Sequence, residues 1–271
     1  MLSDLASFYL SKALSIGNAP AFQTEVVPAA RVTPQMIEHR SVVILNDAPL
    51  PPGLAGGALK RYVERGGGLL VAFGEHSTWP TSEADLLPGR IGNVVDRTEG
   101  RGATVGMRDY SHPVFEVFKA PRSGDFSAPR VLRYRAIETG PGDRVLARYD
   151  DGGITAAEKR VGIGRVIALS TTLDDSWNDL ALKPVYLPLI HQVIRYLAQY
   201  EQTNAWQTVG AVIDLPTAFK GKADRVVVTP ANERIRKAAN ELDSAAFALS
   251  CPAWLLRRIT DWRAEEPSTT A

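Results

Sequence analysis

Two short apolar runs, each followed directly by polar residues, most constrain the fold of this 271-residue chain. They occupy residues 42–45 and 69–73, and uninterrupted runs of this length are typical of strands buried on both faces. Between them, apolar residues at helical spacing follow Pro51 and Pro52 and end at three glycines, residues 66–68, which predicts a helix. A strand–helix–strand unit with short loops predicts a parallel sheet with helices on both faces.

The same reading extends along residues 1–202. Helices are predicted at residues 2–16 and 185–200, with a short one opening at Thr33 and Pro34. A third buried strand is predicted at residues 165–169. Further strands, separated by turns rich in Gly and Pro, are predicted at residues 22–27, 103–107, 131–137, 144–149 and 154–157. The fold class is therefore α/β: a doubly wound, mostly parallel sheet with an added β-rich hairpin region.

The texture of the sequence changes after residue 202. Residues 203–271 are predicted to form a small, irregular C-terminal extension, with short strands at 211–215 and 225–229. The last residues, 265–270, are expected to be disordered. The chain is thus divided into an α/β domain, residues 1–202, and an extension, residues 203–271.

Composition excludes several function classes. The 31 Lys and Arg residues balance 30 Asp and Glu residues, so neither nucleic acid nor an anionic membrane is an expected partner. A single cysteine, Cys251, excludes an internal disulfide framework and a zinc site of paired cysteines. No run approaches the roughly 18 apolar residues of a membrane span, and no signal peptide follows Met1, so the chain as written is expected to be soluble. Gly162 and Gly164 lack the third glycine of a dinucleotide fingerprint, and neither a cofactor nor a metal is expected.

Three loops that follow predicted strands carry the candidate site residues. Ligands of open parallel sheets bind outside the carboxyl ends of the strands, where such loops converge. The residues that could share one crevice are Asp47, Glu75, His76, Asp174, Asp175 and Trp177. Carboxylates beside a histidine can perform acid–base chemistry or hold a hard cation. The alternative is that these are solvated loop residues and helix caps, because Asp favours such places for local hydrogen bonding.

A nucleophile is missing from the expected position. A nucleophile elbow needs Ser or Cys on a sharp strand-to-helix turn, and the corresponding turn here carries Gly74, Glu75 and His76. Nothing fixes a base beside the nearby Ser77, and Cys251, beyond the α/β domain, is expected to serve packing. The sequence therefore argues against a cysteine-dependent hydrolase.

Other histidines and the arginines give weaker signals. His112 precedes Pro113 and is expected to order a loop, whereas His191 is expected to be exposed on its helix. The arginines 31, 40, 61 and 65 are dispersed along the sequence, so no phosphate-tracking stripe is predicted.

Several segments together carry a family resemblance. Residues 42–46, 59–70 and 111–115 resemble the class I glutamine amidotransferase-like superfamily. Residues 164–166, 173–180 and 184–189 are similar to one subgroup of it. That subgroup comprises large bacterial membrane proteins, related to the Bat-type aerotolerance regulators, that also carry a von Willebrand factor A domain. The resemblance covers residues 1–198.

The resemblance implies a flavodoxin-like sheet that has lost the amidotransferase triad, since Glu75 stands where catalytic members have cysteine. It implies a non-catalytic binding or interaction module whose partners are proteins or other domains of a larger membrane-associated protein. Relatives have a strand before the helix at residues 2–16 and membrane segments, so this chain is expected to be a piece of such a protein. Two alternatives stay open. One is an enzyme resembling the trehalose-utilisation branch, acting on carbohydrates through Glu75, His76 and Asp174; the other is a structural spacer.

Overall fold

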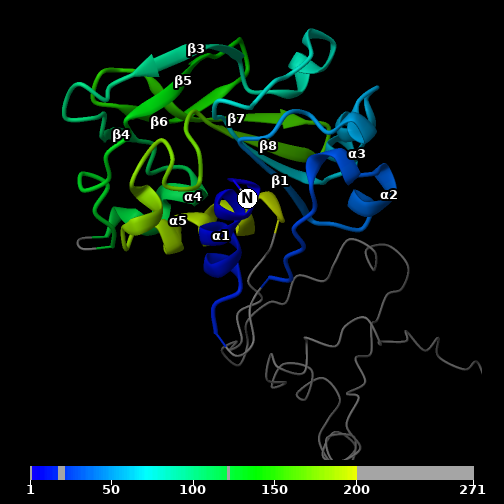
Figure 1. Ribbon diagram of the computed structural model, residues 1–271, viewed down its shortest axis with the longest axis horizontal. Coiled ribbons are helices and arrows are strands. Elements are labelled where there is room, and N and C mark those ends of the chain that lie inside the picture. Colours follow the sequence, from blue (N-terminus) through cyan, green and yellow to red (C-terminus); the bar gives the residue numbers. More distant parts are fainter. Residues whose placement is uncertain (1, 18–21, 121–122, 200–271) are drawn as a thin grey trace, which may run out of the picture. The chain divides into compact units, whose positions relative to one another are not determined.

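The computed structural model describes residues 2–17, 22–120 and 123–199, all within one unit, Met1–Tyr200 (Figure 1). The α-helices are α1 (Leu2–Leu14), α2 (Pro34–Ile37), α3 (Ala58–Glu64), α4 (Pro113–Glu116) and α5 (Tyr186–Leu197). The strands are β1 (Val42–Asn46), β2 (Gly68–Ala72), β3 (Arg90–Asp96), β4 (Val105–Arg108), β5 (Arg133–Glu138), β6 (Arg144–Tyr149), β7 (Ile154–Val161) and β8 (Gly164–Leu169). Short 3-10 turns are η1 (Ala29–Arg31), η2 (Pro52–Leu54), η3 (Thr81–Leu86), η4 (Val117–Lys119) and η5 (Leu180–Leu182).

Six strands form the main sheet in the order β1-β2-β8-β7-β6-β4. The first three are parallel, and their last residues, Asn46, Ala72 and Leu169, are in register. The remaining strands continue as an antiparallel meander, so β1, β2, β8 and β6 run one way and β7 and β4 the other. The predicted α/β class with a mostly parallel sheet is confirmed. The strands β3 and β5 form a separate antiparallel pair.

Alternation along β2 divides the interior into two cores. Leu69 and Val71 face the core that contains α3, while Leu70 and Ala72 face the core that contains α1, α4 and α5. All four side chains are buried, and burying each leucine contributes about 1.5–3 kcal/mol. Helices on both faces of the sheet, visible in Figure 1, are the arrangement that the sequence predicted.

Several predicted elements differ in the structure. The strand predicted at residues 22–27 is wrong: the segment joins no sheet, and Phe22 instead packs edge-on against the His191 ring. Alternating residues make an extended chain, but only a partner makes a strand. The helix predicted from Pro51 starts as the 3-10 turn η2. It becomes α3 only after Gly56 and Gly57, whose φ angles are +69° and +77°.

The middle of the chain shows smaller shifts and one omission. The strands predicted at residues 103–107 and 131–137 begin later, as β4 and β5, and Ala103 and Val131 form only an isolated bridge. The sequence reading missed β3, most of whose residues are exposed or half-buried. A strand without a continuous apolar face gives little periodicity to detect.

In the described ranges, none of the helices is long and apolar enough to cross a bilayer. The strands predicted at residues 211–215 and 225–229, the tail at 265–270 and Cys251 all lie outside the described residues, as does the rest of the predicted extension, residues 203–271.

Candidate functional site

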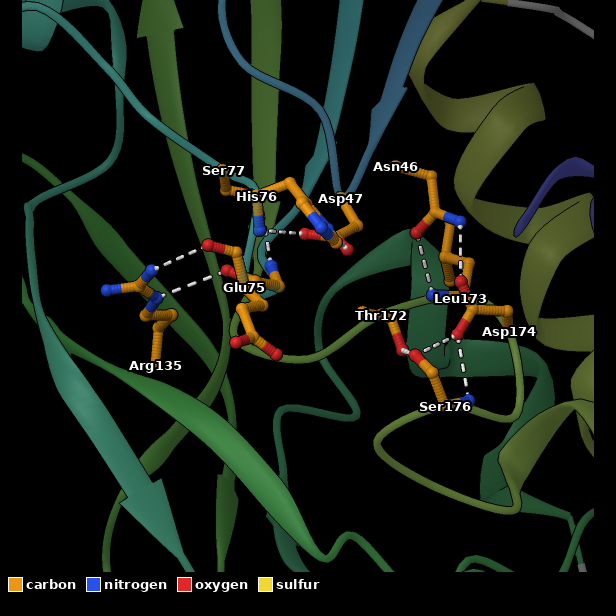
Figure 2. Close-up of polar contacts among 11 residues, drawn as sticks. Asn46, Asp47, Glu75, His76, Ser77, Arg135, Thr172, Leu173, Asp174 and Ser176 are labelled. Carbon is orange, nitrogen blue, oxygen red and sulfur yellow. Dashed lines mark hydrogen bonds and ion pairs between the residues drawn. The ribbon is translucent and has the colours of Figure 1, made fainter. Parts of the chain in front are cut away.

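The loops that follow β1, β2 and β8 meet at one edge of the main sheet (Figure 2). They meet because the three strands are parallel neighbours and end in register, so their polar continuations leave the sheet at the same level. The loop after β1 supplies Asp47, the loop after β2 supplies Glu75 and His76, and the loop after β8 supplies Asp174. This is the edge at which α/β sheets bind ligands.

Asp47 holds the imidazole of His76. One carboxylate oxygen, Oδ1, accepts the backbone N–H of His76 at 2.8 Å, and Oδ2 lies 2.7 Å from His76 Nδ1. A carboxylate only accepts, so Nδ1 carries the proton and Nε2 is left to face a ligand or solvent. The backbone of Asp47 is left-handed, with φ +43°, while its N–H still donates to Ala72 O at 2.9 Å. Asp is one of the few residues that tolerate this conformation.

The two partners of this pair differ in exposure. The His76 side chain is 73% exposed, whereas that of Asp47 is 17% exposed. The hydrogen bond from Asp47, and then its negative charge, raise the pKa of His76. The site therefore presents an imidazole that is fixed from behind and that can either accept or donate a proton near neutral pH.

Close contacts fix the turn that carries His76. A Cβ atom on Gly74 would lie 2.3 Å from Asp47 Oδ1, so only glycine lets the carboxylate approach. The Gly74 N–H donates to Ser77 Oγ at 3.0 Å. From β5, Arg135 donates through Nε to Gly74 O at 3.2 Å and through Nη2 to Glu75 O at 3.4 Å (Figure 2).

The turn at Glu75 is not a nucleophile elbow. Among the described non-glycine residues, positive φ angles occur at Asp47 and Gln199, so Glu75 is unstrained. The chain runs from Glu75 through a loop to Pro80 and then into the 3-10 turn η3, rather than entering a helix. An elbow combines a strained residue with a helix N-terminus, and this turn has neither. The Glu75 side chain is exposed beside His76.

Asp174 organises the loop after β8. It is buried, and its Oδ1 accepts the backbone N–H of Ser176 at 2.9 Å as well as the Ser176 hydroxyl. Its Oδ2 accepts from Asn46 Nδ2 at 3.3 Å, while Asn46 Oδ1 accepts the Leu173 N–H at 2.9 Å (Figure 2). Asp174 thus plays the local structural role that was the alternative for these residues.

The other two candidates make contacts of their own. Asp175 is exposed and accepts a hydrogen bond from the Tyr9 hydroxyl of α1 at 3.0 Å, which raises the pKa of Tyr9. Trp177 is buried, and its carbonyl accepts the N–H groups of Leu132 and Arg133. Of the six candidates, the structure therefore joins Asp47, Glu75 and His76 and gives the others structural contacts. In the part of the chain that is described, no three His, Cys, Asp or Glu residues gather as metal ligands would.

A second polar group, which the sequence reading did not detect, lies inside the protein. His112 and Glu158 are buried, with His112 Nε2 3.1 Å from Glu158 Oε2. His112 Nδ1 accepts the Val114 N–H at 3.2 Å and so caps α4, in agreement with its predicted loop-ordering role. The prediction that His191 is exposed is wrong, because it is half-buried with Nε2 2.8 Å from Ala13 O. A sequence gives no signal for pairing between residues so far apart.

Comparison with known proteins gives a fold. No family model matches the chain, and no curated protein matches it. The cytoplasmic protein STM3548 from Salmonella typhimurium matches with a TM-score of 0.58 at 17% identity, over 70% of this chain and 86% of that one. Cytoplasmic protein STM1381 from Salmonella typhimurium LT2 matches with a TM-score of 0.57 at 18% identity, over 71% and 86%. A ThuA-like protein from Bacteroides uniformis matches with a TM-score of 0.50 at 13% identity, over 74% and 85%.

These likenesses agree with the superfamily that the sequence motifs resemble. The fold is the class I glutamine amidotransferase-like one. At such low identities the amidotransferase-like structures define the fold alone. Nothing in the comparisons supports the narrower likeness to Bat-type aerotolerance regulators or to proteins with a von Willebrand factor A domain, which stays a prediction.

Proposed function

We propose that this chain is a non-catalytic binding module on an amidotransferase-like sheet, and that it works as part of a larger, membrane-associated protein. The observation that carries the proposal is the exposed imidazole of His76, which a shielded Asp47 carboxylate holds from behind. A surface histidine needs no such support to be stable, whereas a binding residue gains from being held in one orientation.

The surroundings of His76 indicate what the module binds. Its Nε2 atom, when neutral, accepts a hydrogen bond, and the neighbouring Glu75 carboxylate also accepts. Two exposed acceptors on one turn favour a small polar molecule that presents hydroxyl or ammonium donors. The left-handed Asp47 and the close approach at Gly74 add to this view, since local strain of this kind clusters at binding sites.

The absence of catalysis is proposed from the same turn. Glu75 occupies the position where a nucleophile is expected, and its backbone has neither the strain nor the following helix of an elbow. The module is therefore proposed to bind its ligand without forming a covalent bond to it.

A second function is favoured by one observation. Asp47 and His76 have the arrangement of an oriented general base, in which a carboxylate fixes the tautomer of an imidazole. One of the similar structures is a ThuA-like protein. An enzyme resembling the trehalose-utilisation branch, acting on a carbohydrate through His76, is the alternative.

A ligand screen by thermal shift tests the proposal. The whole chain is heated with sugars, amino acids, nucleotides and divalent metals in turn, alongside His76→Ala and Glu75→Gln. The matched control is His39→Ala, which removes another exposed histidine. We expect at least one compound to stabilise the wild type and the control but not His76→Ala. A ligand present at a hundred times its Kd stabilises by about 2.7 kcal/mol.

The same screen separates the alternatives. Equal stabilisation of the wild type and His76→Ala, or no stabilisation by any compound, would contradict binding at this turn. If the stabilising compound is a sugar that is slowly converted by the wild type and left intact by His76→Ala, the enzyme replaces the binding module.

A further inference from the structure

A hollow of about 380 Å³ lies at the opposite edge of the main sheet, where β1 and β2 begin. Ser41 precedes β1, and Gly66 and Gly67 precede β2; all three line the hollow together with residues of α2 and α3. Ligands of α/β sheets ordinarily bind at the other edge. This hollow is therefore independent of the His76 turn.

Three guanidinium groups line the hollow: those of Arg40, Arg61 and Arg65. Arg61 and Arg65 are four residues apart on and just after α3, a spacing that brings side chains to the same face of a helix. Arg40 reaches the same place from the end of the loop after α2. The dispersion of these arginines along the sequence thus conceals a cluster that the fold assembles.

The positive charges of this cluster are only partly neutralised. Arg40 pairs with Glu25, and Glu38 is a carboxylate in the lining. Arg61 donates to the Gly56 carbonyl at 3.3 Å, and in the described ranges neither Arg61 nor Arg65 forms an ion pair. Like charges at this helical spacing repel each other. A bound anion would relieve that repulsion.

The floor of the hollow is already built. The Tyr62 ring lies flat on Gly67, where a Cβ atom would come within 2.3 Å of Tyr62 Cζ. The Tyr62 hydroxyl lies 3.0 Å from Arg40 O and 3.3 Å from Gly68 O, so it ties α3 to the start of both strands. A fixed concave floor lowers the ordering cost of binding.

We propose that this hollow binds the phosphate group of a small soluble anion, such as a phosphate ester or a diphosphate. Guanidinium groups match phosphate oxygens with paired hydrogen bonds, and they are favoured over other cations for that purpose. The volume is in the range of small-molecule sites. A soluble ligand fits better than a lipid headgroup, because the cations line a concave surface and the whole chain has a net charge of only +1.

Calorimetric titration of the whole chain with inorganic pyrophosphate, at constant ionic strength, tests the proposal. The variant Arg61→Ala/Arg65→Ala is compared with Arg97→Ala/Arg101→Ala. The control pair removes the same charge from the other hollow, which Asp96–Gly102 residues and Asp150 line. We expect each lost guanidinium to weaken binding about tenfold, which corresponds to the strength of a charge-assisted hydrogen bond. The control should bind like the wild type.

Three further measurements guard the interpretation. Arg61→Lys/Arg65→Lys keeps the charge but loses the paired geometry, so it should bind with intermediate affinity. His76→Ala should leave pyrophosphate binding unchanged, which keeps this test separate from that of the proposed function. Vesicles of phosphatidylcholine with and without phosphatidic acid should not bind.

Any of three results would overturn the proposal: wild-type affinity in Arg61→Ala/Arg65→Ala, a loss of binding confined to the control pair, or binding to phosphatidic acid vesicles without binding to pyrophosphate.

Discussion

Gly74 shows how a single residue can set the geometry of the site. We predict that Gly74→Ala destabilises the protein by about 1–3 kcal/mol, the usual cost of forcing an extra methyl group into a filled space. The added atom would meet Asp47 Oδ1 at 2.3 Å and Thr172 Cγ2 at 2.8 Å. Urea unfolding measures the loss. The control is Gly100→Ala, whose nearest neighbour would be Arg97 O at 3.8 Å; equal losses in both variants would contradict the steric argument.

The titration of His76 provides a second prediction for a single residue. Its pKa is raised by the hydrogen bond and charge of Asp47 and, to a lesser degree, by Glu75. Asp47→Asn should therefore lower the pKa of His76 more than Glu75→Gln does, as followed by NMR. A raised pKa means that the pair stabilises the fold at low pH and loses this effect as pH rises through the folded pKa. An unchanged pKa in Asp47→Asn would show that the pair does not form.

At the scale of residues, only part of the site could be predicted. Asp47, Glu75 and His76 follow buried strands, so the rule that parallel strands end together was enough to find them. Arg135 could not be found, because its role depends on how β5 lies against the loop after β2. Asp174 matched the rule equally well, yet Asn46 and Ser176 occupy both of its oxygens.

At the scale of elements, a buried polar group joins β7, α4 and α5. Burial raises the pKa of Glu158, but hydrogen bonds from His112 and Tyr196 outweigh it and lower the pKa below its ordinary value of 4.5. The group therefore stabilises the fold above that pH and loses its effect as pH falls through the folded pKa.

We predict that Tyr196→Phe costs about 2 kcal/mol near neutral pH, because a buried carboxylate loses a charged hydrogen bond. The variant should also begin to unfold at a higher pH than the wild type when acidified. Unfolding free energies measured across the acid range test both effects. Tyr110→Phe, which removes a hydroxyl that accepts from Arg108, is the control; the same acid shift there would exclude a specific role for Glu158.

Elements were predictable where packing is regular. The strands β1, β2 and β8 have both faces covered, so their apolar runs identified them. The pair of β3 and β5 lies outside the main sheet, and the partly exposed residues of β3 carried no such signal. The extended residues 22–27 show the opposite case, a strand-like pattern without a partner.

At the scale of the whole molecule, stability should be uneven. A two-stranded sheet is marginal by itself, and β3 pairs with β5 alone. We predict that amides of β3 exchange with deuterium faster than those of β2, through a local opening that leaves the main sheet intact. Hydrogen exchange followed by mass spectrometry tests this. Equal protection of β3 and β2 would show that the two sheets open as one.

The position of β2 also has a consequence during synthesis. Its first neighbour, β1, precedes it in the chain, but its second neighbour, β8, is made only after β3 to β7. On the ribosome, the strand that is most completely buried in the finished fold therefore has one open edge until Gly164–Leu169 emerge. An unpaired apolar edge attracts other chains. We expect nascent chains that end before β8 to be bound by chaperones, and those that include it to be released.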